Sequence, residues 1–475
     1  MNIVTVIWIA LPLFIGFSSY LLPRSNRFLA LGMAFVSLAY GLFHIVDPTP
    51  FTLNLVGNFG GTLRVDELSG YFILTNAVVT AAVVLYCWHQ NKSKFFYTQT
   101  VILHGSVNAV FISADLLRLY VALEVIGVAS FLLITYMRSD RAIWVGLRYL
   151  FVSNTAMLFY LIGTALVYQA NQTFAFTALQ NAPIEAIALI FVGLLTKGGI
   201  FVSGLWLPLT HSESETPVSA LLSGVVVKTG VFPVVRFALM FEEIDPLVRS
   251  FGVATALLGV GYAVFEKDTK RMLAFHTVSQ LGFVLAAPEV GGFYALTHGL
   301  VKSALFLISG NFPSRNLKAL KHQPIPRPIW LALAIASFSI SGFPLLSGFG
   351  AKVLTMKNLL PWQVIAMNIA ALGTAVSFAK FIFLPAGGEG KPKAGFWPAM
   401  AILLGGLVLA NVVYYEAYTL GNVVKPLATI ALGWLAYLFI FQKISLKIPR
   451  AIERFDHLIG VMSLMVLLLF GMVLA

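Results

Sequence analysis

The sequence has few charged residues and almost no cysteine. Only 11% of its 475 residues are charged, whereas 59% are hydrophobic, and this composition excludes a soluble globular protein. A single cysteine, Cys87, cannot form an internal disulfide, a cysteine-based zinc site or an iron–sulfur cluster. We therefore expect Cys87 to be a buried structural thiol.

Several functional motifs are also missing. The sequence contains no phosphate-cradling glycine loop, nucleophile triad or dinucleotide fingerprint, so we expect no cofactor, no metal and no use of ATP by this chain. Its net charge of +12 does not indicate nucleic-acid binding, because no basic stretch is interleaved with stacking aromatic residues.

Apolar runs of about 20 residues recur along the chain, and this length crosses about 30 Å of hydrocarbon as a helix. The runs lack the alternation typical of barrel strands. They predict an all-α polytopic membrane protein with about 14–16 transmembrane helices, from 3–22 to 455–474. The run at 3–22 has no basic n-region and no cleavage site, so we expect it to be a retained span.

The loop charges predict the orientation in the bilayer. Of the 31 Lys and Arg residues, seven lie within predicted spans, and 19 of the other 24 fall in loops on one side. The five on the opposite side are Arg64, Arg118, Arg249, Lys357 and Lys425. The positive-inside rule makes the first side cytoplasmic and places both termini outside. We expect a bacterial-type cell membrane, with a thylakoid or other energy-transducing membrane as the alternative.

Two predicted spans contain helix-breaking sequences. Leu207–Thr210 interrupts the seventh span and Ser341–Leu345 the twelfth, and each carries a proline that removes a backbone donor. Such breaks persist in a membrane only where protein or cavity water satisfies the freed groups. We predict inverted five-helix repeats in a chain divided into N-terminal helices (1–96), a first repeat (97–241), a second repeat (242–386) and C-terminal helices (387–475).

Five charged residues lie deep inside predicted spans: Glu124, Lys197, Lys228, Lys302 and Lys352. A charge at the bilayer centre costs a few kcal/mol or more, so it normally faces a bundle interior and marks an ion or proton path. Lysines withdrawn from water also release their proton more readily than free ones. The pattern therefore predicts a protein that translocates protons or cations.

Glu124 is the only acidic residue well inside a span. A buried carboxylate either pairs with a cation or carries a proton, and its natural partner is Lys197, which precedes two glycines. The pair is either a switch that sets the proton affinity of Lys197 or a structural contact between helices.

Other ionisable residues extend the predicted path. Lys228 follows Pro217 by eleven residues, or about 16 Å of helix, too deep for comfortable snorkelling. His298 and Lys302 are four residues apart and share one helix face. His276 is either a path residue or a satisfied structural histidine, and Arg148 is either a secondary path residue or a snorkelling or paired structural one.

The segment His211–Pro217 is an acidic loop on the predicted cytoplasmic side, with two glutamates. It either takes up protons or docks a partner, or it is a solvated turn that caps the next helix.

These residues resemble a known family, the antiporter-like subunits shared by Mrp-type sodium/proton antiporters and respiratory complex I. The resemblance covers roughly residues 60 to 385 and is closest to the D-type subunits of Mrp antiporters. It rests on segments spread along the chain: Ser113–Tyr120 with Glu124, Thr216–Leu222 with Lys228, Lys267–Gly282, His298–Leu307 and Gly348–Lys352. Two departures are Gly224, where relatives often have histidine, and Gly350, where a bulky residue is usual.

The resemblance implies that Glu124 and Lys197 form a coupling pair, that Lys228, His298 and Lys302 form a central relay, and that Lys352 is the terminal site. It implies other membrane subunits, H⁺ and Na⁺ as partners, within the lipid bilayer. The leading hypothesis is a proton-conducting subunit of a cation/proton antiporter. Alternatives are a non-redox proton-pumping subunit of a complex I-type enzyme, the membrane subunit of an inorganic-carbon uptake system, and a non-conducting scaffold.

Overall fold

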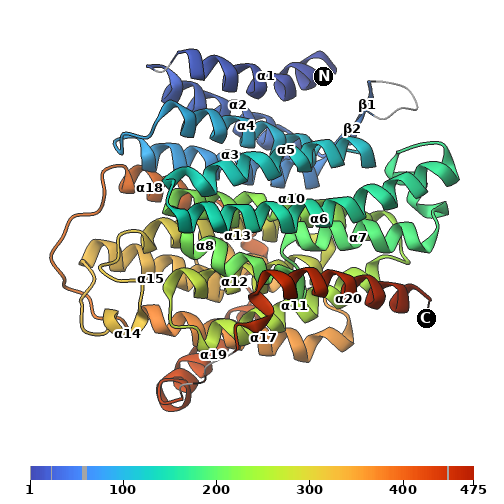
Figure 1. Ribbon diagram of the computed structural model, residues 1–475. Coiled ribbons are helices and arrows are strands. Elements are labelled where there is room, and N and C mark those ends of the chain that lie inside the picture. The colour runs from blue at the N-terminus through green and yellow to red at the C-terminus, as the bar shows by residue number, and fades with distance from the viewer. Residues whose placement is uncertain (1, 23, 56–60, 445, 447–448, 475) are drawn as a thin grey trace.

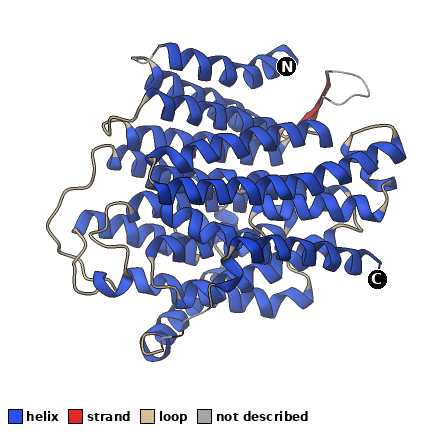
Figure 2. Ribbon diagram, in the orientation of Figure 1, coloured by secondary structure: helices blue, strands red, loops and turns tan. Residues whose placement is uncertain are grey.

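The computed structural model describes residues 2–22, 24–55, 61–444, 446 and 449–474. Regular structure in these residues is almost entirely helical (Figure 2). The exception is one antiparallel hairpin, β1 (Phe51–Asn54) and β2 (Thr62–Val65), in which Phe51 lies opposite Val65. The prediction of an all-α membrane protein is therefore confirmed.

The helices of the first half are α1 (Asn2–Leu21), α2 (Asn26–Val46), α3 (Glu67–Cys87), α4 (Lys94–Phe111), α5 (Leu116–Ile134), α6 (Asp140–Asn171), α7 (Ile184–Gly198), α8 (Leu207–Glu213), α9 (Thr216–Leu221) and α10 (Lys228–Met240). Those of the second half are α11 (Asp245–Phe265), α12 (Thr269–Ala286), α13 (Gly291–Ser309), α14 (Leu317–Leu320), α15 (Arg327–Ser341), α16 (Ser347–Lys357), α17 (Val364–Ile382), α18 (Phe396–Val413), α19 (Leu420–Ala436) and α20 (Phe455–Leu474).

Thirteen helical segments of the described chain are long and apolar enough to cross a membrane. The other three predicted spans correspond to α4, α12 and the α15–α16 pair, which lie within the same bundle (Figure 1). Buried polar side chains such as His104 and Gln280 interrupt the apolar sequence of α4 and α12. The beginning of α1, the end of α20 and the hairpin lie at the same end of the bundle (Figure 1).

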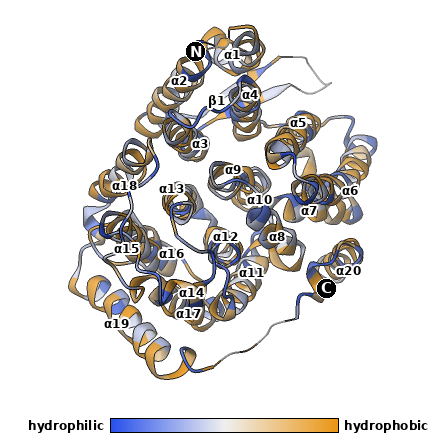
Figure 3. Ribbon diagram, turned by 60° about the vertical axis from the view of Figure 1, so that its left-hand side comes forward, coloured by the Kyte–Doolittle hydropathy of each residue, from blue (hydrophilic) through white to orange (hydrophobic). Residues whose placement is uncertain are grey.

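The helices differ sharply in burial, and this difference positions the charged residues. The apolar windows of Thr216–Met240 and Pro288–Ser309 are entirely buried, whereas only 17% of the window in Leu420–Phe441 is. Figure 3, which views many helices nearly end-on, shows α9, α10, α12 and α13 enclosed by the others, with α19 and α20 at separate edges. Lys228, His298 and Lys302 therefore lie in protein rather than in lipid.

The seventh span is broken, but not where the proline predicted. Helix α7 ends at Gly198, Gly199 takes a positive φ of 70°, and a 3₁₀ helix at Phe201–Trp206 leads into α8. Pro208 lies in the first turn of α8, where the missing N–H costs nothing because it would have no helical partner. The break therefore lies at the paired glycines, Gly198 and Gly199, and not at the proline.

The twelfth span is broken at the predicted place, between Ser341 and Ser347. Gly342 caps α15 at a φ of 88°, and Leu345 also has a positive φ of 79°, an uncommon conformation for a leucine. Gly199 and Gly342 both donate their N–H groups back to the last turn of the preceding helix. The two breaks thus share one type of glycine cap.

A second irregularity directly precedes Lys228. Residues Leu222–Val226 form a π-helical turn between α9 and α10, and such turns free backbone carbonyls from the ordinary helical ladder. No sequence signal had indicated it. Gly224 within this turn lies close to the Ser303 hydroxyl, which would be only 2.2 Å from an added Cβ, so a larger side chain here would require Ser303 to move.

Candidate functional site

Lys197 lies at the end of α7, only 3% exposed, and donates a 2.5 Å hydrogen bond to the Ser153 hydroxyl of α6. Within the described residues Glu124 forms no ion pair with it, although the two charges interact electrostatically. One carboxylate oxygen of Glu124 is buried without a hydrogen-bond partner. Gly127, one turn further along α5, leaves room for the ammonium, which would be 3.1 Å from a Cβ there.

Lys228 and His298 are in direct contact at the centre of the bundle. The Lys228 ammonium is 3.3 Å from His298 Nδ1 and donates to the Ser223 carbonyl at 3.2 Å. That carbonyl belongs to the π-helical turn. Both side chains are almost fully buried, so α10 and α13 bring together two ionisable groups that lie 70 residues apart.

Lys302 and His276 extend this centre along α13 and α12. The Lys302 ammonium donates to the Leu273 carbonyl and lies 5.1 Å from the centre of the Phe306 ring. Both ring nitrogens of His276 lack hydrogen-bond partners among the described residues, and its ring packs 4.7 Å from that of Phe378. His276 is therefore buried with no hydrogen-bond partner among the described residues, and its role in a proton path stays a prediction.

Lys352 lies beyond His298, next to the break between α15 and α16. Its ammonium has no hydrogen-bond partner in the described chain and lies 5.6 Å from the centre of the Phe283 ring. A cavity of about 10 Å³ is lined by both Lys352 and His298, together with Gln280 and Tyr294. This volume is close to the smallest that holds one water molecule, and the cavity borders both side chains.

Sequence reasoning missed the burial of His211. The segment from His211 to Glu213 is the end of α8 rather than a solvated turn, and His211 is fully buried with neither ring nitrogen hydrogen-bonded to described residues. Its ring stacks on Phe306 with centroids 4.7 Å apart, while Lys302 lies over the same phenylalanine. The polar residues Thr210 and Ser212–Thr216 surround it in the sequence, and such a run is typical of a loop.

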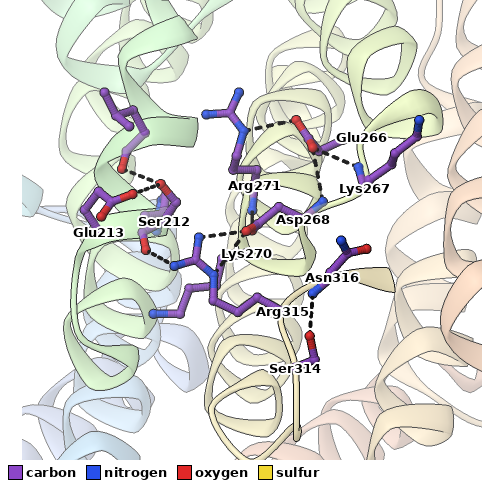
Figure 4. A network of polar contacts seen from close by, with 12 residues as sticks. Ser212, Glu213, Glu266, Lys267, Asp268, Lys270, Arg271, Ser314, Arg315 and Asn316 are labelled. Atoms are coloured by element: carbon purple, nitrogen blue, oxygen red, sulfur yellow. Dashed lines mark hydrogen bonds and ion pairs between the residues drawn. The ribbon is translucent and has the colours of Figure 1, made fainter. Parts of the chain in front are cut away.

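A polar network covers the predicted cytoplasmic end of α8 (Figure 4). Arg315 donates to the Ser212 carbonyl at 2.7 Å and to Asp268 at 2.7 Å, and Lys270 donates to the Ser214 carbonyl. These contacts tie α8 to the start of α12.

Arg148 connects to the same network through Glu453 and Arg271. It donates to the Glu453 carbonyl, and the Glu453 carboxylate accepts from Arg271 at 2.6 Å. Arg271 also pairs with Glu266 at 3.0 Å (Figure 4). Burial alone would raise the pKa of Glu266, but N–H donors from Asp268 and Lys267 and the charge of Arg271 hold it below its ordinary value. Arg148 therefore links α6 to the segment that precedes α20.

Comparison with known proteins identifies the family. The family described as the NADH:quinone oxidoreductase/Mrp antiporter transmembrane region matches residues 113–377. The D-type subunit of the Na⁺/H⁺ antiporter of Alkalihalophilus pseudofirmus is 27% identical in an alignment 396 positions long, which covers 74% of this chain and 80% of that protein. The NAD(P)H-quinone oxidoreductase chain 4-3 of a Nostoc species is 30% identical in an alignment 390 positions long, which covers 73% of this chain and 69% of that one.

Solved structures show the same fold. A chain of an archaeal membrane-bound sulfane sulfur reductase gives a TM-score of 0.76 at 20% identity, covering 92% of this chain and 99% of that one. A chain of the Mrp complex from a Dietzia species gives 0.71 at 23% identity over 98% of this chain, which spans 55% of the other. The protein is thus a multi-pass protein of the cell membrane, and it belongs to the NADH:quinone oxidoreductase/Mrp antiporter family.

Proposed function

We propose that this chain is the proton-conducting subunit of a multisubunit cation/proton antiporter, with Na⁺ as the exchanged cation and other membrane subunits as partners. The contact of Lys228 with His298, continued to Lys352 by a shared small cavity, is the observation that carries the proposal. Ionisable groups inside a membrane bundle normally mark a proton path. The similarity to a D-type subunit of a Na⁺/H⁺ antiporter supports the choice of cation.

In this proposal, protons enter at the cytoplasmic end of the broken seventh span. Lys197 lies in the last turn of α7, directly before the break, and His211 lies in the last turn of α8, beyond it. From there the protons pass to the central group of Lys228, His298 and Lys302. The missing steps need water, because no direct hydrogen bond joins Lys197 to Lys228 among the described residues.

Transfer between neighbouring sites follows from their charges. A protonated Lys228 disfavours a second positive charge on His298, since like charges in contact oppose each other's ionisation. A proton that moves from the Lys228 ammonium to His298 Nδ1 would leave Lys228 neutral, and the unpartnered Nε2 of His298 could pass a proton on towards Lys352. The sites therefore titrate as a coupled group.

Glu124 would control the first step. Its carboxylate acts electrostatically on Lys197 without contacting it, and one oxygen is free of described partners. A positive charge supplied near Glu124 by a neighbouring subunit would weaken its influence on Lys197 and favour release of the lysine proton.

We further propose that residues 97–241 and 242–386 are inverted repeats, flanked by the N-terminal helices of 1–96 and the C-terminal helices of 387–475. The support is the common glycine cap at Gly199 and Gly342, each at the break of a span with a buried lysine. Breaks at corresponding positions are typical of inverted-repeat transporters.

The test is proton and Na⁺ flux in vesicles that contain the whole assembly. Glu124→Gln and Lys352→Ala are each expected to assemble normally and to lose most of the flux. Normal flux from assembled variants would refute the relay and would favour a scaffold.

A second candidate is the proton-pumping subunit of a complex I-type oxidoreductase, favoured by the 30% identity to the Nostoc chain. Isolation of the native assembly discriminates the two, because small antiporter subunits or a quinone-reducing module would copurify with the chain.

A further inference from the structure

A cavity of about 220 Å³ lies between α16, α17 and α19, next to Lys352. This is several times the ~30 Å³ that one water occupies in the liquid. Three lysines line it: Lys352 at the buried end, and Lys357 and Lys425, which are both exposed. None of the described residues that line the cavity is acidic.

The buried end of the cavity has an unmatched cation. The Lys352 side chain is only 6% exposed, and its ammonium has no hydrogen-bond partner within the described chain. A buried charge without a partner is strongly unfavourable. The Phe283 ring at 5.6 Å supplies only a weak cation–π contact, so the ammonium needs a counter-ion whenever it is protonated.

The other polar side chains of the lining donate hydrogen bonds to backbone carbonyls. The Ser341 hydroxyl donates to the Ser337 carbonyl and the Thr429 hydroxyl to the Lys425 carbonyl. Asn368 and Asn422 each donate one amide hydrogen, to the Val364 and Ala417 carbonyls, and keep a second one. The three ammonium groups are the charged donors of the described lining, and their charges repel a cation and attract an anion.

We propose that this cavity binds an anionic oxygen group, with Lys352 below it and Lys357 and Lys425 at its rim. Such a group is either the phosphate of a phospholipid on the predicted outer side or a small inorganic oxyanion. Both offer several acceptor oxygens to three ammonium donors. Helix α19, which supplies Lys425, lies outside the family-matched region of 113–377, whereas Lys352 and Lys357 lie within it.

The lipid-facing surroundings bear on the source of the anion. Val364 lines the cavity and is 39% exposed, and its neighbour Ile365 is 76% exposed. Acyl chains would therefore lie beside the opening, as a bound phospholipid requires. Free phosphate or bicarbonate would need only the three lysines.

Binding is measured on the complete assembly without an ion gradient, so the result does not depend on proton conduction. Assemblies of the wild type, of Lys357→Gln/Lys425→Gln and of the control Lys391→Gln, an exposed loop lysine that does not line the cavity, are purified and delipidated. Phosphatidylglycerol retention is read by native mass spectrometry, with phosphatidylcholine as a second lipid. Inorganic phosphate and bicarbonate are titrated by calorimetry.

The double variant is expected to bind the anion at least about tenfold more weakly than either the wild type or the control, since each charge-assisted contact contributes that much or more. Preferential retention of phosphatidylglycerol identifies a lipid, and binding of phosphate or bicarbonate alone identifies a free oxyanion. Equal binding by all three proteins, or none by the wild type, would overturn the proposal.

Discussion

Replacement of Asp66 by Asn is expected to destabilise the predicted outer ends of α3 and α10. The Arg236 guanidinium donates through both terminal nitrogens to the Asp66 carboxylate, with Nη2 to Oδ1 at 2.9 Å, and Nη2 also donates to the Ser69 hydroxyl at 3.0 Å. Arg236 is only 5% exposed. The substitution removes the counter-charge and leaves the guanidinium buried. Because Arg236 is on the helix that begins at Lys228, this contact also positions the proposed relay.

The size of the effect follows from this geometry. Breaking a buried ion pair by removal of one partner costs about 3–5 kcal/mol. Asn caps a helix as well as Asp does, so the cap at the start of α3 is retained. A cavity of about 410 Å³ is lined by Arg236 and Arg64, and water in it would partly solvate the guanidinium. We therefore expect about 3 kcal/mol, at the lower end of the range.

Cys87 provides the assay, because it is the only cysteine and is fully buried in α3. Its labelling by a thiol reagent reports the population of the opened protein. A loss of about 3 kcal/mol corresponds to roughly 100-fold faster labelling when opening is at equilibrium.

The pH dependence has a defined sign. Burial alone would raise the pKa of Asp66, but hydrogen bonds and charge from Arg236, the Ser69 N–H and the charge of Arg64 hold it below its ordinary value. A carboxyl group whose pKa is lowered by folding stabilises the protein when the pH is above its pKa in the unfolded chain, which is about 4. This stabilisation is lost as the pH falls through the pKa of the folded protein. A pyridyl disulfide, which reacts in acid, should therefore label the wild type faster below about pH 4, and Asp66→Asn should lack this component.

Two comparisons decide the interpretation. Arg64→Gln breaks only the partly exposed pair with Asp66 and should cost less than about 1 kcal/mol. Asp66→Asn/Arg236→Met removes both charges and should recover most of the lost stability. Labelling of Asp66→Asn at the wild-type rate would refute this reasoning.

Two more predictions concern helix packing. Gly230→Ala should destabilise the protein by about 1–3 kcal/mol through overpacking, because the added Cβ would lie 2.3 Å from the Gly198 nitrogen. The midpoint of thermal unfolding should therefore fall. Gly261→Ala should leave the midpoint unchanged, because nothing lies within 4 Å of a Cβ added there. Glu453→Gln should weaken the ion pair with Arg271 and speed proteolysis between α19 and α20. Equal cleavage rates of the wild type and the variant would show that this ion pair does not stabilise the segment.

The sequence predicted what depends on composition and local order. Apolar length predicted the spans, and the Gly-Phe-Pro sequence after Ser341 predicted the break before α16. Pro208 predicted a helix break at the wrong place, because a proline is tolerated in the first turn of a helix. The break instead lies at Gly199, which has a positive φ.

Contacts between distant segments were not predictable. The 3.3 Å contact of Lys228 with His298 depends on how α10 and α13 cross, and no local pattern encodes that geometry. The same applies to Glu453, whose partner Arg271 is 182 residues away. Polar neighbours made His211 resemble a loop residue, although tertiary packing buries it.

Proton flux through Lys228→Met, compared with Lys380→Met, tests the central claim most directly. Lys380 is also a buried lysine, but its ammonium donates to the Ala263 and Glu266 carbonyls at 3.0 Å and so caps α11 outside the proposed path. In vesicles that contain equal amounts of the complete assembly, Lys228→Met should lose most of the flux and Lys380→Met should retain it. Wild-type flux from Lys228→Met, or equal losses in both variants, would contradict a path through the buried Lys228 and His298.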